Sequence, residues 1–316
     1  MMERMDWINL LLFPEGSAQD VWNRIAANLA EIALTEESPV QIHNQTILPD
    51  RLLCEAAYPL WHDFAAAAPH TSTRLIQKCF GNCAVLILDA LSLREMSLIV
   101  KEAQARGILS EASVTFSEAP SETNCFALAL GASSRASLKD NGKTSSFKLF
   151  GADCYTDVQG IPFADVPVPP QPHLVIWHSY LDDHIHNGRS GEELYSMAKK
   201  EFTGEGFWTL IDKLRQGRKV IITSDHGYGV AEQFSSEIRD TQAVEILKSQ
   251  FKAQRYAKIT PPEEIFIPPF FVTNGGYCIV TGQRKWKSPG GFPRVCHGGL
   301  SLLEVASPWI EINALI

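Results

Sequence analysis

The sequence has no Cys-x-x-Cys pair, although its 316 residues include seven cysteines. The cysteines are scattered along the chain, whereas thiolate zinc sites and disulfide frameworks use closely spaced or paired cysteines. The sequence therefore indicates neither kind of site, and this cysteine usage is typical of a reducing, cytoplasmic environment.

Long apolar runs are also lacking. The first residues, MMERMDWINLLLFPEG, contain an apolar stretch that is too short for a secretory signal peptide. No later run is long enough to cross a bilayer. We therefore expect a soluble, cytoplasmic protein without a membrane partner.

An excess of basic residues is missing as well, because the formal net charge is −8. Proteins that coat nucleic acid are normally basic, so the charge argues against that class of function. It still permits a site that handles a single phosphate group. The hydrophobic content of 45% and the charged content of 20% are those of an ordinary globular protein.

Apolar strand-like segments alternate with helical segments from about residue 81 onward. Val85 to Leu88 predict a buried strand, and the helix that follows is expected to end at Gly107. A second helix, ending at Gly217, leads into the apolar run KVIIT at 219–223. This alternation predicts an α/β fold with a doubly wound, mostly parallel central sheet flanked by helices.

The residues before about 81 mix helical pieces with alanine-rich and proline-containing connections. Ser17 and Asp20 predict a capping box, followed by a helix with one apolar face. This segment shows no residues arranged for chemistry. We therefore divide the chain into a helical N-terminal segment, 1–80, and an α/β domain, 81–316.

Acidic and histidine side chains follow several of the predicted strands. In a parallel sheet the carboxyl ends of the strands share one edge, and ligands bind there. Asp182 and His186 are four residues apart, so one helical turn would bring them together. The complete set is Asp89, Asp182, His186, Asp225, His226 and His297.

Each of these residues alone also fits a strand-end cap, an Asx turn, a solvated loop or a structural histidine. Taken together, they supply carboxylate oxygens and imidazole nitrogens, which are the usual ligands of zinc, whereas oxygen donors alone would favour magnesium. The set divides into two groups of three. Two metal ions a few ångströms apart form a clamp that is typical of phosphoryl transfer.

The segment EAPSETNCFALALG offers a nucleophile. Thr123 opens an apolar helix, and the N-terminus of a helix stabilises an anion. A Thr hydroxyl activated by a metal ion could attack phosphorus. The alternative is that Ser121 or Thr123 is simply the N-cap of this helix.

These motifs, in this order, resemble the PglZ domain of the alkaline phosphatase superfamily. They are a strand-end aspartate, a Pro-Ser-x-Thr turn, an Asp-x-x-x-His, the segment SDHG at 224–227, and the ending HGGLSLLEVASPWIEI at 297–312. The resemblance covers residues 80–316. It implies an alkaline-phosphatase-like fold and two divalent metal ions, expected to be zinc, with manganese and magnesium as alternatives.

The resemblance also implies the roles of the residues. One metal ion would be held by Asp182, His186 and His297. The other would be held by Asp89, Asp225, His226 and the oxygen of Thr123. Thr123 would be the nucleophile.

Two positions depart from the family pattern. PglZ domains often have Arg where this sequence has Ser92, and Arg94 follows two residues later. Asp183 adjoins Asp182, so either could be the ligand, and Asp182 is chosen because its spacing to His186 fits the family. Further candidates for binding the substrate, each with a solvated basic loop as the alternative, are Arg94, Arg284, Lys285, Lys287 and Arg294.

The expected function is that of a metal-dependent phosphodiesterase or phosphatase, acting in bacterial phage defence of the BREX kind or in signalling. The acidic charge favours a small nucleotide or an activated ester over duplex DNA as substrate. One alternative is a slow or non-catalytic metal-binding scaffold with protein partners in a phage-defence complex. The other is a phosphotransferase or mutase on the same fold.

Overall fold

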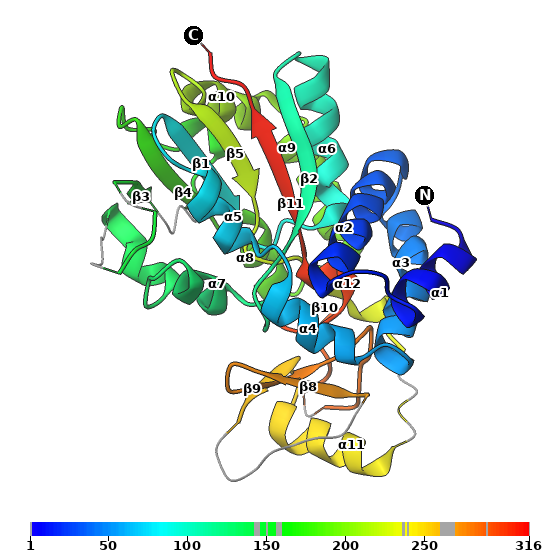
Figure 1. Cartoon of the computed structure of the whole chain (residues 1–316). Coiled ribbons are helices and arrows are strands. Elements are labelled where there is room, and N and C mark those ends of the chain that lie inside the picture. Colours follow the sequence, from blue (N-terminus) through cyan, green and yellow to red (C-terminus); the bar gives the residue numbers. More distant parts are fainter. Residues whose placement is uncertain are drawn as a thin grey trace.

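A six-stranded sheet forms the centre of the molecule (Figure 1). The computed structural model describes residues 2–141, 146–149, 151–155, 160–235, 238, 240–259, 269–288 and 290–315. The strand order is β2-β11-β5-β1-β4-β3. The bounds are β1 (Cys83–Leu88), β2 (Leu109–Phe116), β3 (Asp153–Tyr155), β4 (His173–His178), β5 (Lys219–Thr223) and β11 (Ala306–Ile312).

The sheet is mostly parallel. Strand β1 pairs in parallel with β4 and β5, and β3 pairs in parallel with β4. Only β11 among these strands runs against its neighbours, β5 and β2. The predicted fold class, an α/β fold with a mostly parallel sheet flanked by helices, is confirmed.

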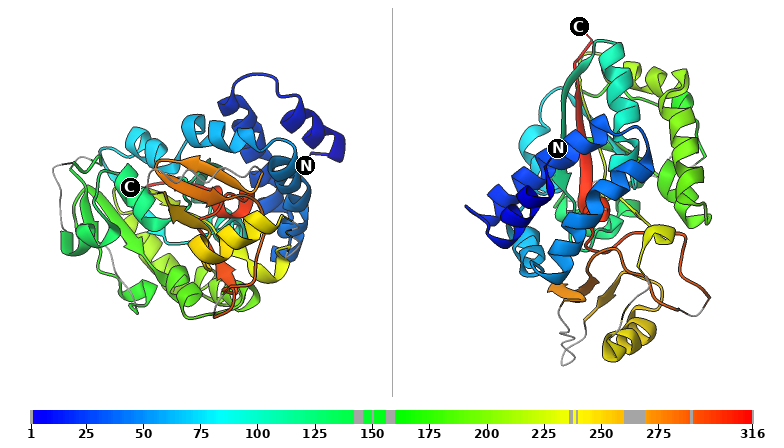
Figure 2. Two further views of the ribbon diagram at one scale, coloured as in Figure 1. Left: turned by 90° about the horizontal axis from the view of Figure 1, so that it is seen from below. Right: turned by 90° about the vertical axis from the view of Figure 1, so that its right-hand side faces the viewer.

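Helices cover both faces of the sheet, as Figure 2 also shows. Ala84, Leu86 and Leu88 of β1 belong to one apolar core, whereas Cys83, Val85 and Ile87 belong to the core on the opposite face. Because successive side chains of a strand point to opposite faces, a strand buried on both sides is continuously apolar. Helices that contribute side chains to the first core include α2 (Ala18–Thr35), α6 (Leu93–Ala105), α9 (Gly191–Phe202) and α10 (Glu205–Leu214), and helices α5 (Thr71–Lys78) and α7 (Thr123–Ala129) contribute to the second.

The N-terminal segment is helical, as predicted. Ser17 and Asp20 form the expected capping box at the start of α2. Helix α2 packs against α6 and β2, so it shares a core with the sheet. The division into two domains at residue 80 stays a prediction. The other helices of this segment are α1 (Arg4–Leu12), α3 (Pro39–Glu55) and α4 (Pro59–Ala67).

A second, three-stranded antiparallel sheet was not predicted from the sequence. We call its strands β7 (Tyr256–Lys258), β8 (Phe271–Asn274) and β9 (Tyr277–Val280) the small sheet. Figure 1 shows it with α11 (Thr241–Ile246) at the end of the central sheet where β5 finishes. The π-helical turn η4 (Leu247–Phe251) follows α11, and apolar side chains of both pack against the small sheet.

The remaining elements are short. They are α8 (Tyr180–His186), α12 (Leu302–Val305), the paired strands β6 (Gly229–Val230) and β10 (Val295–Cys296), and the 3-10 turns η1 (Arg135–Asn141), η2 (Phe163–Asp165) and η3 (Ala231–Gln233). Within the described part of the chain, no helix has the length and apolar character that crossing a membrane requires.

Candidate metal centre

The ends of β1 and β5 bring the first group of candidate ligands together. The two strands are parallel neighbours, with Ile87 beside Thr223, so the residues that follow them lie at one edge of the sheet. Asp89, Asp225 and His226 each have one potential ligand atom within 4.8 Å of the other two. All three are fully buried. We call them the buried cluster.

The imidazole of His226 is oriented by the backbone. Its Nδ1 lies 2.9 Å from the carbonyl oxygen of Gly227. Because a carbonyl can only accept, Nδ1 carries the hydrogen in this contact and the lone pair lies on Nε2. Nε2 faces Asp225 Oδ2 at 3.5 Å and Asp89 Oδ1 at 3.8 Å. The nitrogen is therefore presented as a ligand beside two carboxylates.

The surroundings of Asp89 disfavour an isolated negative charge. Its pKa is raised well above the usual range, first by burial and then by the charges of Asp225 and Asp182. Arg135 forms an ion pair with Asp89, and Trp177 Nε1 donates a hydrogen bond to Oδ2 at 3.1 Å. Two carboxylates buried within 4.8 Å of each other favour a proton or a cation between them.

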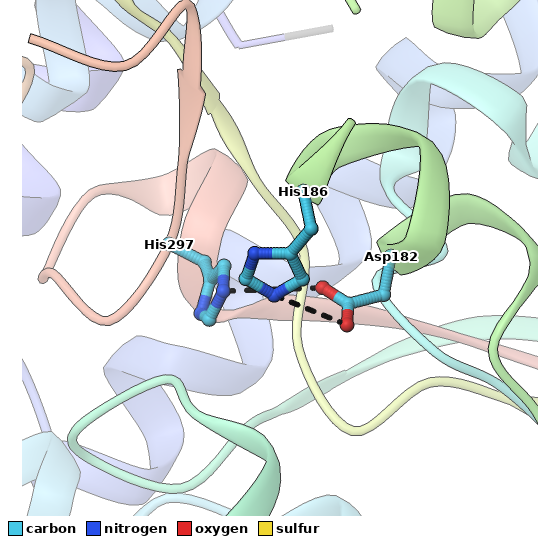
Figure 3. Close-up of side chains that lie close together, drawn as sticks. All are labelled: Asp182, His186 and His297. Carbon is cyan, nitrogen blue, oxygen red and sulfur yellow. Dashed lines mark ion pairs between the residues drawn. The ribbon is translucent and has the colours of Figure 1, made fainter. Parts of the chain in front are cut away.

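The second group, Asp182, His186 and His297, forms what we call the outer cluster (Figure 3). Asp182 and His186 lie one turn apart on α8, and His186 Nε2 is 3.4 Å from Asp182 Oδ2. His297 comes from the turn after β10, and its Nε2 is 4.0 Å from Asp182 Oδ1. Three ligand atoms from two distant segments thus face one another.

The electrostatics of the outer cluster favour a cation among its members. Burial opposes ionisation of Asp182, but its contact with His186 and the neighbouring histidine charges lower its pKa overall. The same contact raises the pKa of His186. Burial, followed by the charge of His226, lowers the pKa of His297 to about 3. Asp182 is thus an anion and His297 a neutral imidazole, the forms in which both bind metals.

Thr123 contacts all three members of the buried cluster. Its Oγ1 donates to Asp225 Oδ2 at 2.9 Å and lies 3.3 Å from His226 Nε2. The rings of His226 and His297 are stacked, with centroids 4.2 Å apart and planes 12° apart. The structure therefore brings together all seven residues predicted as ligands or nucleophile, although their roles stay predictions.

The alternative interpretation of the Pro-Ser-Glu-Thr turn is wrong, because neither Ser121 nor Thr123 is the N-cap of α7. Glu122 is the N-cap, and its carboxylate accepts hydrogen bonds from the backbone N–H groups of Asn124 and Cys125. Ser121 is fully buried; its hydroxyl donates to Gly299 O at 2.9 Å and accepts from Gly298 N at 3.0 Å. The hydroxyl of Thr123 therefore does not cap the helix and instead contacts the buried cluster.

A cavity of about 840 Å³ opens beside the two clusters. Thr123 and the outer cluster line it, together with Arg135 and Arg294. Gln254 and Tyr256, at the start of the small sheet, form another part of its wall. This volume is within the range of sites that bind small organic molecules.

The five basic residues predicted to bind the substrate have different surroundings, and only Arg294 among them lines the cavity. Arg294 lines the cavity, and Lys287 is exposed. Lys285 donates to the carbonyl of Ala231 at 2.7 Å. Arg284 stacks on Phe270 and lines a separate cavity beside α3. Their positions support a substrate contact for Arg294 alone among these four.

The expectation for Arg94 needs correction. Its side chain is buried, and its guanidinium donates to the carbonyl of Tyr228 at 2.7 Å and lies over the tyrosine ring. A guanidinium held in this way packs α6 against the loop after β5. It is not among the residues that line the cavity.

The structure separates Asp182 from its neighbours. The carboxylate of Asp183 accepts a hydrogen bond from Ser179 Oγ at 2.9 Å, outside the outer cluster. His184 packs against Tyr180 and lines, with Asp183, another cavity. The choice of Asp182 and His186 as the candidate ligands therefore agrees with the geometry.

Sequence reasoning missed two residues that contact Asp89. Trp177 could have been found, because it lies near the end of β4, directly beside Ile87 of β1. Arg135 carries no such signal, because it lies in η1, far from Asp89 in the sequence and outside every motif.

Both clusters fit divalent metal ions. Each combines carboxylate oxygens with imidazole nitrogen, the donor set of zinc and related ions. Asp182 Oδ1 is buried and has no hydrogen-bond partner among the described residues, as expected for an atom reserved for a cation. These are the features of candidate metal-binding groups.

No family model matches the chain, and no curated protein matches it. Solved structures that it resembles include two of phosphonoacetate hydrolase from Sinorhizobium meliloti 1021, one in complex with phosphonoacetate and one with phosphonoformate. Both are 12% identical in sequence, and the matches cover 74% of this chain and 91% of the other. The TM-scores are 0.40 and 0.41, too low to carry a conclusion about activity.

Proposed function

We propose that this protein hydrolyses phosphate esters, as a phosphodiesterase or phosphatase, with two divalent metal ions and Thr123 as the nucleophile. The observation that carries the proposal is the position of the Thr123 hydroxyl. It lies within 3.4 Å of an oxygen or nitrogen of every member of the buried cluster, and Thr123 lines the cavity that the outer cluster also lines.

Asp89, Asp225 and His226 would hold one metal ion, with Thr123 beside it, and Asp182, His186 and His297 would hold the other. Zinc is favoured by the mixture of carboxylates and imidazoles, with manganese and magnesium as alternatives. When bound, the ions would polarise the phosphoryl group and favour ionisation of the hydroxyl.

Asp225 and Thr123 have different roles in the reaction. Asp225 accepts the hydroxyl hydrogen and orients Oγ1. The hydroxyl proton passes to Asp225, Oγ1 attacks phosphorus, the bond from phosphorus to the departing ester oxygen breaks, that oxygen takes up a proton, and a phosphothreonine forms. Water then attacks the phosphothreonine, releases phosphate or a phosphate monoester, and restores the hydroxyl.

The substrate belongs to the class of small phosphate esters, such as a nucleotide or an activated ester. Arg135 and Arg294 line the cavity, and arginine side chains suit phosphate oxygens. The net charge of −8 disfavours long duplex DNA.

The order of the motifs supports membership of the PglZ domain family. Membership would place the protein in the bacterial cytoplasm, in phage defence or signalling. Protein partners in a defence complex are part of this proposal. The site geometry favours hydrolysis over a purely structural role, because a scaffold has no need of a hydroxyl held among the three candidate ligands of the buried cluster.

The test compares Thr123→Ala with Thr123→Ser. The substrates are bis(p-nitrophenyl) phosphate and p-nitrophenyl phosphate, at saturating zinc or manganese. Thr123→Ala should keep its fold and most of its metal, but lose several orders of magnitude in turnover, at least ~4 kcal/mol of barrier. Thr123→Ser should retain part of the activity.

Melting curves and metal content of each variant serve as controls. Wild-type rates in Thr123→Ala would rule out the covalent mechanism. A wild-type protein that binds metal yet hydrolyses neither ester above background would favour the scaffold, and phosphate transfer to an added alcohol in place of water would favour the phosphotransferase.

A further inference from the structure

A fully buried arginine connects the small sheet to the segment that follows His297. Arg255 directly precedes β7, and its Nε and Nη2 donate to the two carboxylate oxygens of Glu304 on α12, each at 2.8 Å. Arg255 also donates to the carbonyls of Gly282 and Arg284. Both partners of the ion pair are fully buried, so this pair is held in one fixed geometry.

Glu304 in turn contacts the two turns that carry candidate histidine ligands. Its Oε1 accepts from the backbone N–H of Gly299, two residues after His297, at 3.0 Å. Its backbone carbonyl accepts from the N–H of Gly227, the residue after His226, at 2.9 Å. One residue therefore ties together the turns whose histidine rings are stacked.

The two glycines after His297 allow this close approach. A Cβ atom at Gly299 would lie 2.4 Å from Arg255 Nε, and one at Gly298 would lie 2.5 Å from the ring of Tyr256. Gly298 also has a φ of +95°, which L side chains rarely adopt. The start of the small sheet is therefore packed directly on the turn that carries His297.

We propose that Arg255 and Glu304 are a positioning pair for the metal centre. By fixing the turns of His226 and His297 relative to each other, the pair sets the spacing of the buried and outer clusters and makes the small sheet necessary for metal binding. Residues that hold metal ligands in place affect metal affinity by roughly 10–100-fold. The inference rests on the proposed function to the extent that both clusters bind metal ions.

Two substitutions separate this role from a general contribution to stability. Arg255→Lys keeps the charge but cannot make the bidentate contact. Glu304→Gln keeps an acceptor for Gly299 but removes the charge. The matched control is Arg218→Lys, since Arg218 is also a buried arginine with several hydrogen bonds. Arg218 directly precedes β5, so it lies at the opposite end of that strand from Asp225.

The measurement is a Co²⁺ titration followed by visible absorption, with the melting temperature of each metal-free variant. We expect Arg255→Lys and Glu304→Gln to bind Co²⁺ roughly tenfold or more weakly than the wild type. The Co²⁺ affinity of Arg218→Lys should stay within about twofold of the wild-type value, even if its melting temperature falls as much as those of the two site variants.

Unchanged Co²⁺ affinity in both site variants would overturn the inference. An equal loss of Co²⁺ affinity in Arg218→Lys would also overturn the inference. Failure of both site variants to fold while the control folds would overturn it too, because the pair would then stabilise the fold as a whole. A wild-type protein that binds no Co²⁺ would instead refute the proposed metal centre itself.

Discussion

Two hydroxyl residues of one short turn have opposite surroundings. Ser121 is buried, and its hydroxyl is held by the backbone of Gly298 and Gly299. Thr123 is half-buried, and its hydroxyl faces the carboxylates of Asp89 and Asp225. At the scale of single residues, Ser121 therefore supports the structure, whereas Thr123, two positions later, is the proposed nucleophile.

Ser121→Ala should therefore affect stability more than chemistry. The substitution leaves the N–H of Gly298 and the carbonyl of Gly299 without their partner, which lowers the free energy of unfolding by about 1–3 kcal/mol. Urea unfolding measures this loss, and the hydrolysis rate should fall far less than in Thr123→Ala. A Ser121→Ala protein of normal stability that no longer hydrolyses ester would identify Ser121 as the attacking residue.

Arg135→Gln should weaken substrate binding. The guanidinium pairs with Asp89 and lines the cavity, where a hydrogen bond from a cation to a phosphate contributes about 1.5–3 kcal/mol. We expect KM for the phosphodiester to rise about tenfold or more. Lys287→Gln is the control, because Lys287 is exposed and does not line the cavity. Equal KM values in Arg135→Gln and the wild type would remove Arg135 from the substrate site.

At the scale of elements, one buried carboxylate joins helix α3 to helix α12. Asp50 accepts hydrogen bonds from the backbone N–H of Leu302 at 2.8 Å and from Gln283 Nε2 at 2.6 Å. Burial raises its pKa to about 7, although these hydrogen bonds oppose the rise. The N-terminal helices thus contact the segment that follows His297 through an acid that titrates near neutral pH.

The pH dependence of stability follows from Asp50. Because its pKa is higher in the folded state than its ordinary value of 3.8, the folded state binds more protons between about pH 4 and pH 7. This contribution to stability is therefore complete at low pH and is lost as the pH rises towards 7. About three pKa units at about 1.4 kcal/mol each give a loss of up to about 4 kcal/mol.

In Asp50→Asn, the free energy of unfolding should decrease less as the pH rises from about 4 to 7. The measurement is urea unfolding from pH 4.5 to 7.5, with a chelator present so that metal binding does not contribute. Glu95, another buried acid whose pKa burial raises to about 7, provides a second variant, Glu95→Gln, that should remove a similar part of the slope. Parallel curves for the wild type and Asp50→Asn would contradict this assignment.

At the scale of the whole molecule, the candidate ligands come from separate segments: the ends of β1 and β5, helix α8, and the turn after β10. The complete sites therefore exist only in the folded chain. A ligand that binds only the folded state stabilises it, by about 2.7 kcal/mol at a free concentration of one hundred times Kd.

We expect about two divalent ions per chain at saturation, and a lower melting temperature after chelation. The double variant Asp225→Ala, His297→Ala, which loses one ligand from each cluster, should bind less metal and respond less to the chelator. Elemental analysis and melting curves measure both effects. A double variant with as much metal as the wild type would place the metal elsewhere.

The sequence by itself determined the mostly parallel character of the central sheet, though not its short edge strand β3, and the edge at which the candidate site lies. The buried strands β1 and β5 are continuous apolar runs, and the helices between strands have one apolar face, so periodicity predicts them. Asp89 directly follows β1, Asp225 and His226 follow β5 after Ser224, and parallel neighbours end at the same edge. Asp182 and His186 meet because one helical turn joins them. These relations are local, or follow from the geometry of a parallel sheet.

Only the tertiary structure decided the contacts that depend on the paths of long connections. Arg135 reaches Asp89 from η1, and Arg255 reaches Glu304 from the start of the small sheet, with no local pattern marking either residue. The choice of Asp182 over Asp183 as candidate ligand agrees with α8, which turns one carboxylate toward His297 and the other toward Ser179. A sequence records which side chains a segment carries, but contacts between distant segments are set by how loops and helices pack in three dimensions.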